Sequence, residues 1–190
     1  PLAKIIHVDI DPAEHNKNRA VDIPVVADSK DFLEYGCQKL WASKGNKEWL
    51  RQINLQSSRH KVEGYRDQDP EGVMELINSL LDEETIVVTD VGQHQMWAAL
   101  FVHPLKSRSF ITSGGLGTMG FGLPAAIGAQ MACPDKKVVL ITGDGSLQMN
   151  LQELAVIKQW KLPIKILMIN NGSLGMVRQW QELFFQKNYA

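Results

Sequence analysis

The residues best suited to chemistry are a carboxylate between two glycines and a pair of amides further along the chain. They are Gly143-Asp144-Gly145-Ser146 and Asn170-Asn171. A carboxylate and an amide oxygen are ligands that Mg2+ accepts, and water and substrate phosphates complete its shell. Gly145 would let a phosphate approach the backbone, and a helix beginning at Ser146 would direct free N–H groups at it. The two stretches therefore predict a site for a divalent cation and a phosphate.

The segments between these stretches predict how they meet. Residues 137–142 form a β-branched run that ends at a glycine, which indicates a buried strand, and residues 164–169 form a second one. From Leu147 the apolar residues recur at helical spacing until Pro163 ends the helix. A right-handed crossover makes two such strands parallel, with both carboxyl ends at one edge. Asp144 and Asn171 are therefore expected within about 5–10 Å of each other, since neighbouring strands lie about 4.8 Å apart.

Residues 85–131, which come before these segments, repeat this order of strand, loop and helix. Strands are expected at 85–89 and 109–112, loops at 90–94 and 113–120, and helices at 96–101 and 123–131. A helix over 70–81, with Val73, Leu76, Ile77 and Leu80 as its apolar face, comes before them. Three glycine-containing loops between strand and helix predict an α/β fold, with a doubly wound, mostly parallel sheet, helices on both faces and a ligand at its carboxyl edge.

The first forty residues predict a piece of another α/β domain. Strands are expected at 3–10 and 23–26, and a helix runs from a cap at Asp28 or Ser29 to about residue 41. Because a lone edge strand cannot support itself, we expect residues 1–42 to be the C-terminal remnant of a further domain. Residues 43–68 are polar and interrupted by glycine and serine, which predicts a linker with one short helix around residues 49–53. Residues 69–190 then form the domain that carries the site.

Composition excludes several classes of protein. The 190 residues are 44% hydrophobic and 22% charged, which is typical of a globular chain. A net charge of −1 gives no basis for binding nucleic acid or an anionic membrane. No apolar run has the length of a membrane span. Cys37 and Cys133 lie far apart without a metal-binding spacing, which favours free thiols and a cytoplasmic location.

A competing motif lies at residues 115–120, which fit the pattern G-x-G-x-x-G of dinucleotide-binding domains. The motif follows a strand and precedes a helix, and Asp144 ends the next strand, where a ribose-binding acid would stand. This alternative predicts NAD binding that is independent of Mg2+. It leaves residues 92–94 and the Asn170-Asn171 pair without a role, and Gly122 and Pro124 delay the helix. A module that folds and dimerises without binding a ligand is a third alternative.

The spacing of Gly143-Asp144-Gly145 and Asn170-Asn171 resembles the diphosphate-binding signature of thiamine diphosphate (ThDP) enzymes. Within that family, the chain is similar to the catalytic large subunits of acetolactate synthases (acetohydroxyacid synthases). The similar stretches are VGQHQMW at 91–97, SGGLGTMGFGLPAA at 113–126 and NNGSLGMVRQW at 170–180. The stretch IIHVDIDP at 5–12 resembles part of the central, FAD-associated domain of these enzymes. The resemblance thus covers the whole chain and implies that residues 69–190 are a C-terminally truncated pyrophosphate-binding domain.

The resemblance also implies roles for individual residues. Mg2+ would be held by Asp144, Asn171 and the carbonyl of Ser173, and Met119 would support the central bend of ThDP. The cofactor-binding set would be Val91, Gly92, Gln93, His94, Gly117, Met119, Asp144, Gly145, Ser146, Asn171, Ser173, Leu174, Gly175 and Met176. Met176 and Trp180 share a helix face and would reach the substrate, although their spacing alone favours core packing. FAD would approach Asp9, Ile10, Asp28 and Ser29.

The implied activity is decarboxylation of pyruvate and condensation with a second 2-ketoacid, giving 2-acetolactate or 2-aceto-2-hydroxybutyrate in branched-chain amino acid biosynthesis. The implied assembly is a homodimer or homotetramer, with a small regulatory subunit as a further partner. A related ThDP carboligase or oxidase acting on another 2-ketoacid would share the phosphate site. The activating glutamate of the family belongs to a pyrimidine-binding domain that this chain lacks, so no catalytic residue is identified here. We therefore expect the chain by itself to be inactive and to bind ThDP weakly at best.

Overall fold

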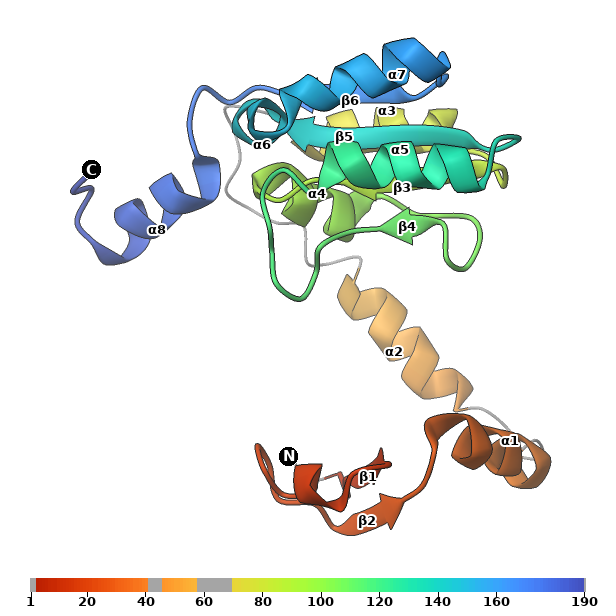
Figure 1. Ribbon diagram of the computed structural model, residues 1–190. Coiled ribbons are helices and arrows are strands. Elements are labelled where there is room, and N and C mark those ends of the chain that lie inside the picture. Colours follow the sequence, from red (N-terminus) through yellow and green to blue (C-terminus); the bar gives the residue numbers. More distant parts are fainter. Residues whose placement is uncertain (1–2, 41–45, 58–69, 190) are drawn as a thin grey trace. The chain divides into compact units, whose positions relative to one another are not determined.

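The computed structural model describes residues 3–40, 46–57 and 70–189. The chain divides into two compact units, Pro1–Val62 and Glu63–Ala190 (Figure 1). The division falls inside the predicted linker, of which residues 43–45 and 58–68 lie outside the described ranges. The assignment of residues 1–42, 43–68 and 69–190 to domains stays a prediction.

The first unit contains a parallel pair of strands, β1 (Ile6–Asp9) and β2 (Ile23–Val26). A short 3-10 helix, η1 (Pro12–Glu14), lies between them, and helices α1 (Ser29–Leu40) and α2 (Lys47–Ser57) follow. Strand β1 is shorter than the predicted range 3–10 because β2 offers only four residues in register. Asp28 acts as the predicted cap, since its Oδ1 accepts the N–H of Lys30 at 2.8 Å. Residue 41, the predicted helix end, lies outside the described ranges.

The second unit is organised around a four-stranded parallel sheet with the order β4-β3-β5-β6. Its strands are β3 (Thr85–Thr89), β4 (Phe110–Ile111), β5 (Lys137–Gly143) and β6 (Lys165–Ile169). Alternate side chains of the two central strands face opposite ways: Val87 and Ile141 enter one buried cluster, whereas Val88 and Leu140 enter another. This arrangement confirms the predicted parallel α/β sheet.

Helices cover both faces of this sheet (Figure 1). On one face, α3 (Pro70–Leu80) and α4 (Gln93–Phe101) contribute Met74, Ile77, Trp97 and Ala98 to the cluster that contains Val87. On the other face, α5 (Gly122–Ala132) and α7 (Leu154–Trp160) pack against Val88 and Leu140. None of the helices in the described ranges combines the length and the apolar composition that crossing a bilayer requires.

The apolar face predicted for residues 70–81 was partly wrong. Ile77 is buried as expected, but Val73, Leu76 and Leu80 are exposed, and Met74 takes the central buried position. The helix therefore meets the sheet along Pro70, Met74 and Ile77, a stripe rotated from the predicted one. The spacing of apolar residues fitted both stripes, and contact with α4 and β3 selects between them.

The single helix predicted after β5 is broken into three pieces. They are α6 (Asp144–Met149), the 3-10 helix η2 (Leu151–Glu153) and α7. The break occurs at Asn150, whose backbone leaves the helical region (φ −131°, ψ 30°) while its Nδ2 donates to the carbonyl of Gly120 at 2.6 Å. Helix α6 also begins at Asp144 rather than at the predicted Ser146.

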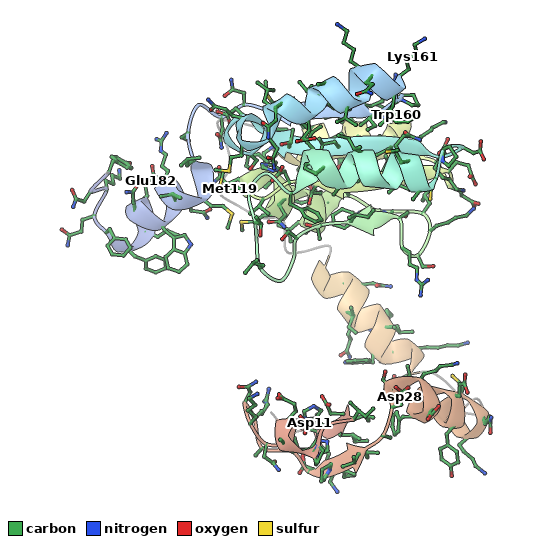
Figure 2. The ribbon with its side chains drawn as sticks, in the orientation of Figure 1. Asp11, Asp28, Met119, Trp160, Lys161 and Glu182 are labelled. Carbon is green, nitrogen blue, oxygen red and sulfur yellow. The ribbon has the colours of Figure 1, made fainter. Side chains whose placement is uncertain are left out.

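The order of the strands places a crevice at the carboxyl edge of the sheet. The chain leaves β3 for β4 on one side and then crosses to β5 on the other, so the loops after β3 and β5 diverge. Such a switch point is where open parallel sheets bind ligands. Met119 lies on the side where the strands end, and Trp160 and Lys161 lie on the side where they begin (Figure 2). Helix α8 (Gly175–Phe184) follows β6 at the same carboxyl edge.

Candidate functional site

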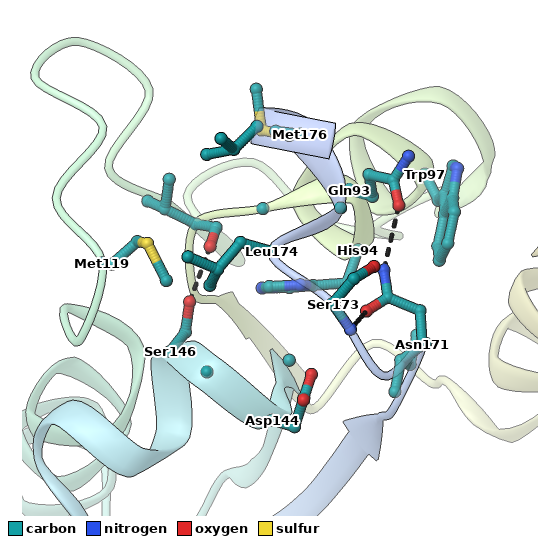
Figure 3. A pocket seen from close by; sticks show the side chains of 17 residues that line it. Gln93, His94, Trp97, Met119, Asp144, Ser146, Asn171, Ser173, Leu174 and Met176 are labelled. Atoms are coloured by element: carbon teal, nitrogen blue, oxygen red, sulfur yellow. Dashed lines mark hydrogen bonds between the residues drawn. The ribbon is translucent and has the colours of Figure 1, made fainter. Parts of the chain in front are cut away.

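The loops after β3, β4, β5 and β6 line one pocket (Figure 3). Every residue of the predicted cofactor-binding set except Gly117 lines it. Its lining consists of Val91, Gly92, Gln93, His94, Trp97, Met119, Gly143, Asp144, Gly145, Ser146, Ile169, Asn171, Ser173, Leu174, Gly175, Met176 and Val177. Residues from the three stretches that suggested the family are thus brought together at one edge of the sheet.

The pairing of β5 with β6 brings the predicted metal ligands together. Gly143 stands opposite Ile169, so Asp144 and Asn171 emerge one and two residues beyond paired strand ends. The Asn171 Nδ2 donates to Gln93 Oε1 at 2.9 Å, and its Oδ1 accepts the N–H of Ser173 at 3.2 Å. That Oδ1 keeps a second lone pair. The Asp144 carboxylate forms no hydrogen bond or ion pair with a described residue.

These donors suit one class of metal. Within the described ranges, no group of three or more His, Cys, Asp or Glu side chains could hold a metal ion. One carboxylate, one amide oxygen and a backbone carbonyl are instead the sparse oxygen set with which Mg2+ is bound when phosphates and water supply the remaining ligands. The residues at this corner therefore fit Mg2+ bound together with a phosphate ligand.

His94 is a buried histidine with an unpartnered ring nitrogen. Its side chain is only 5% exposed, and Nε2 has no hydrogen-bond partner among the described residues. A Cβ at Gly143 would lie 2.9 Å from its Nδ1, and a Cβ at Gly92 would lie 2.7 Å from its Cε1, so both glycines make room for the ring. Burial lowers the pKa of His94 below the usual 6.5, although the nearby Asp90 opposes this change. The imidazole is therefore neutral at pH 7.

Two glycines of the pocket are closely packed by side chains. A Cβ at Gly145 would lie 2.9 Å from Leu174 Cδ2, and a Cβ at Gly175 would overlap the Gln93 amide, so these side chains occupy the space that a Cβ would need. Both glycines still line the pocket, and backbone N–H groups are common partners of phosphates. A cation corner beside such main chain fits a Mg2+-bound diphosphate.

Ser146 has a different role from the one its position suggested. The residue is buried, and its Oγ donates to the carbonyl of Val91 at 2.6 Å (Figure 3). The hydroxyl therefore ties the loop after β3 to the start of α6. A contact with the diphosphate would have to come from the Ser146 main chain, and this part of the assignment stays a prediction.

Two predicted site residues lie outside the pocket. Gly117 is exposed in the loop between β4 and α5. Trp180 is 59% exposed, and its ring packs against Phe184 with 5.1 Å between ring centroids. Met176, four residues earlier on α8, does line the pocket. The predicted substrate pair is therefore split in this structure, and the roles of Gly117 and Trp180 stay predictions.

Four residues that line the pocket were left out of the predicted site residues, although Gly143 belongs to the motif that suggested the site: Trp97, Gly143, Ile169 and Val177. Two of them had a readable signal. Trp97 stands three residues after His94 on the same helix, which places both on one face. Ile169 is the last residue of β6, where a side chain at a strand end reaches the edge crevice.

The residues assigned to FAD gather at one edge of the first unit. Asp9 ends β1, and Asp28 and Ser29 follow β2, its parallel neighbour. The main chains are joined there, since the N–H of Ala27 donates to the carbonyl of Asp9 at 3.1 Å. Ile10, the fourth of these residues, is exposed. The arrangement is compatible with a shared ligand, and the FAD assignment stays a prediction.

The position of the G-x-G-x-x-G motif disfavours the dinucleotide alternative. The motif follows β4, the outer strand of the described sheet, and not a strand at the switch point. A Cβ at Gly120, the third glycine of the motif, would lie 2.9 Å from Asn150 Nδ2 and 3.1 Å from Met149 Cβ, so this glycine packs against the end of α6 and not against a strand. In dinucleotide-binding domains the motif instead closes a tight turn against the first helix.

Comparison with known proteins agrees with this geometry. Residues 90–190 match the family described as "Thiamine pyrophosphate enzyme, C-terminal TPP binding domain", thiamine pyrophosphate being another name for ThDP. The chain is 45% identical over 204 residues to the "Probable acetolactate synthase large subunit" of Methanococcus aeolicus, covering 97% of this chain and 34% of that protein. It is 41% identical over 199 residues to the "Acetolactate synthase isozyme 3 large subunit" of Escherichia coli (strain K12), covering 100% and 35%.

A third relative is the "Acetolactate synthase large subunit" of Corynebacterium glutamicum, 45% identical over 199 residues, with 100% of this chain and 32% of that protein covered. The chain spans about a third of the length of these relatives. The matches confirm the resemblance to acetolactate synthase large subunits that the three motif stretches carry. On this basis, the chain belongs to the thiamine pyrophosphate enzymes and contains their C-terminal TPP-binding domain.

Proposed function

We propose that the pocket binds the diphosphate of ThDP together with Mg2+, and that the chain serves an acetolactate synthase. One observation carries the proposal: Asp144 and Asn171 line a single pocket at the switch point, together with the glycines Gly145 and Gly175. A hard cation binds to oxygen donors of this kind, and backbone N–H groups are common partners of a diphosphate. The names of the relatives support the choice of reaction.

Each residue of the pocket has a distinct task in this proposal. Asp144, Asn171 and the Ser173 carbonyl hold Mg2+, which neutralises the diphosphate. Gln93 Oε1 accepts from Asn171 Nδ2 and so keeps the other end of that amide, Oδ1, available to the metal. His94 offers its unpartnered Nε2 from a neutral ring, so it binds without adding charge. Val91 and Gly92 shape the loop that carries both side chains.

The apolar side of the pocket would take the organic part of the cofactor. Met119, Leu174 and Met176 line it, and these side chains exclude water from the region next to the cation corner. When bound, ThDP supplies the electron sink for decarboxylation of a 2-ketoacid, while the protein supplies position and electrostatics. Met176 and Trp180 are proposed to contact the 2-ketoacid substrates, pyruvate as donor and pyruvate or 2-ketobutyrate as acceptor.

The assembly and setting of the whole enzyme are proposed from the same relatives. Their printed names specify a large subunit, which supports a homodimer or homotetramer with a small regulatory subunit. We also propose FAD at Asp9, Ile10, Asp28 and Ser29, a role in branched-chain amino acid biosynthesis and a cytoplasmic location. Both cysteines are free thiols, as expected in a reducing compartment.

The cofactor site is tested by calorimetric titration of ThDP into the chain with and without Mg2+. We expect binding that requires Mg2+ and that weakens at least tenfold in Asp144→Asn, because the variant loses the single carboxylate of the cation corner. Asp82→Asn is the matched control, since it removes one carboxylate at the opposite end of the strands. Equal ThDP affinity in Asp144→Asn and the parent chain, or binding unaffected by Mg2+, would contradict the proposal.

Two further assays separate the alternatives. Titration of NAD in place of ThDP tests the hypothesis that the chain is a dinucleotide-binding domain, and we expect no NAD binding. A product assay on the assembled enzyme, with pyruvate alone and with pyruvate plus 2-ketobutyrate, tests the reaction. Formation of 2-acetolactate or 2-aceto-2-hydroxybutyrate supports an acetolactate synthase, whereas a different carboligation or oxidation product would assign the chain to another ThDP enzyme.

A further inference from the structure

The carboxylate of Asp90, at the end of β3, is fully buried. It forms no ion pair with a lysine or arginine of the described ranges. Its Oδ1 accepts the N–H groups of Val91 at 2.7 Å and Gly120 at 2.9 Å, and its Oδ2 accepts the N–H of Gly122 at 2.9 Å. A carboxylate is costly to bury unless hydrogen bonds replace its hydration, and here three backbone donors do so.

Two of these hydrogen bonds lead to the junction of the β4–α5 loop with α5, one to Gly120 in the loop and one to Gly122, the first residue of the helix. Gly120 is held from both ends, because Asp90 accepts its N–H and Asn150 Nδ2 donates to its carbonyl at 2.6 Å. Gly120 also has a φ of 87°, a left-handed conformation that side chains other than glycine rarely adopt. The loop is therefore fixed at the residue directly after Met119.

Met119 is the residue by which this loop enters the pocket. A Cβ built at Gly145 would lie 3.7 Å from Met119 Cε, so the end of the Met119 side chain stands over the main chain after β5. The path of contacts runs from Asp90 through Gly120 to Met119, and from Met119 across the pocket to Gly145. Asp90 itself does not line the pocket.

We propose that Asp90 is a positioning residue that fixes Met119, and with it one wall of the pocket, relative to Gly145. The consequence for ThDP rests on the proposed function, because only a ligand between these walls would sense their separation. A merely structural reading is that Asp90 caps α5, whose N-cap residue Phe121 makes no side-chain cap bond. A cap would stabilise the helix without controlling Met119.

The variant Asp90→Asn separates these readings because it keeps the shape of the side chain. Its Oδ1 can still accept from Val91 and Gly120, but its NH2 group would face the N–H of Gly122, donor against donor. NMR of 13C-methyl methionine and amide exchange then report on the loop directly. We expect the Met119 methyl signal to shift or broaden, and the Gly120 and Gly122 amides to exchange about tenfold faster or more.

Two internal references accompany the measurement. The methyl signal of Met74, fully buried between α3 and the sheet, should not change. The variant Asp82→Asn, at the opposite edge, should leave Met119 unchanged even if it lowers stability. An unchanged Met119 signal in Asp90→Asn, accompanied by a lower melting temperature, would overturn the proposal in favour of a simple helix cap.

Asn150→Ala provides a second route if Asp90→Asn does not fold. It removes the hydrogen bond to the Gly120 carbonyl from the other side of the loop, and the same shift of Met119 is expected. No shift in that variant would likewise overturn the proposal. None of these signals needs a cofactor, so failure of ThDP to bind the parent chain would count against the proposed function alone. Where ThDP binds, we expect Asp90→Asn to weaken its affinity about tenfold.

Discussion

The two ends of the strands in the second unit satisfy their polar groups in opposite ways. Where the strands begin, acidic and basic side chains neutralise each other: Asp82 pairs with Lys137, Glu84 with Lys136, and Lys106 bridges Glu83 at 3.3 Å and Glu84 at 3.2 Å. Where the strands end, the Asp144 carboxylate forms no hydrogen bond or ion pair with a described residue, and His94 Nε2 has no hydrogen-bond partner among them. The Asp90 carboxylate accepts hydrogen bonds from main chain only.

The difference distinguishes a structural edge from a binding edge. The paired charges lie at the surface, where each ion pair contributes little and salt screens it. A buried polar atom without a partner is costly and therefore calls for an explanation, such as a bound ion, a water or a catalytic role. The edge where the strands begin also has one such atom, Gln130 Oε1, beside the loop that precedes β5. The unpartnered groups of the carboxyl edge, Asp144 and His94, converge on one pocket, and it is at this edge that we propose a ligand binds.

The largest expected effect on stability comes from crowding the carboxyl edge at Gly122. In Gly122→Ala the new Cβ would lie 2.8 Å from both Asp90 Cβ and Leu140 Cδ1 and 2.9 Å from the Asp90 backbone nitrogen. Backbone and core atoms cannot move away cheaply, so we expect the free energy of unfolding to fall by about 1–3 kcal/mol. Urea unfolding measures this change.

Gly128→Ala is its matched control on the same helix. A Cβ at Gly128 would meet no atom within 4 Å, so alanine should instead stabilise the protein by about 0.5–1 kcal/mol through its helix propensity. Changes of the same sign in both variants would show that close packing around Asp90 is not what requires Gly122.

The next effect concerns binding rather than stability. In Gly175→Ala the new methyl group would overlap Gln93 Oε1 and lie 2.5 Å from Asn171 Nδ2, which breaks the hydrogen bond between these two amides. Gln93 can swing away because its amide ends a flexible side chain, so stability should change little. We expect ThDP affinity in the presence of Mg2+ to fall about tenfold, or about 1.4 kcal/mol, by calorimetry. Unchanged affinity would mean that Gln93 does not orient Asn171.

A smaller effect should appear in the dependence of stability on pH. The folded protein lowers the pKa of His94, mainly by burial, so the unfolded chain binds more protons below pH 6.5. The contribution of His94 is therefore complete above pH 6.5 and is lost as the pH falls through its lowered pKa. Urea unfolding from pH 8 to pH 5 should show this loss, and His94→Gln should remove it. The exposed His103→Gln serves as the control, and an equal change there would contradict the assignment to His94.

The smallest effect is expected where the strands begin. The hydrogen bond from Lys137 is the main cause that lowers the pKa of Asp82 from 3.8 to about 2. This contribution is present above pH 3.8 and is lost as the pH falls toward 2. In low salt, Asp82→Asn should remove this loss of stability at acid pH, and in high salt it should change the free energy of unfolding little, as urea unfolding can show. Titration of ThDP should give an unchanged affinity. A larger loss of stability than in Gly122→Ala would reverse the ranking of the two edges.

Local sequence signals were sufficient for the framework of the site. Strand β3 was predicted with its observed bounds, because a β-branched run ending in a turn leaves little choice of structure. The adjacency of β5 and β6 follows from the strand, helix, strand order, and it is this adjacency that brings Asp144 and Asn171 to one pocket. Motif spacing therefore predicted which loops converge.

Local sequence patterns did not predict the contacts between residues that lie far apart in the chain. In the sequence, Asp90 is an acidic residue at the end of a predicted strand. Its neighbours in the sequence do not indicate that its oxygens accept the N–H groups of Gly120 and Gly122. The break at Asn150 was missed for the same reason, since the apolar pattern continues through it while its side chain bonds to Gly120. Met74 likewise replaced Val73 in the core only because α3 packs against α4 and β3.

The proposal that the carboxyl edge holds the metal is tested most directly by locating the metal with Mn2+. Added with ThDP, this paramagnetic substitute for Mg2+ broadens NMR signals of nearby amides. The proposed site predicts that the amide signals of Gly145, Asn171 and Ser173 are lost selectively, while the signals of Thr85 and Lys137 persist. In Asp144→Asn this selective broadening should no longer occur. Broadening centred on the carboxylates of Asp82, Glu83 and Glu84 instead, or none at the carboxyl edge, would contradict the assignment of the pocket as a metal and diphosphate site.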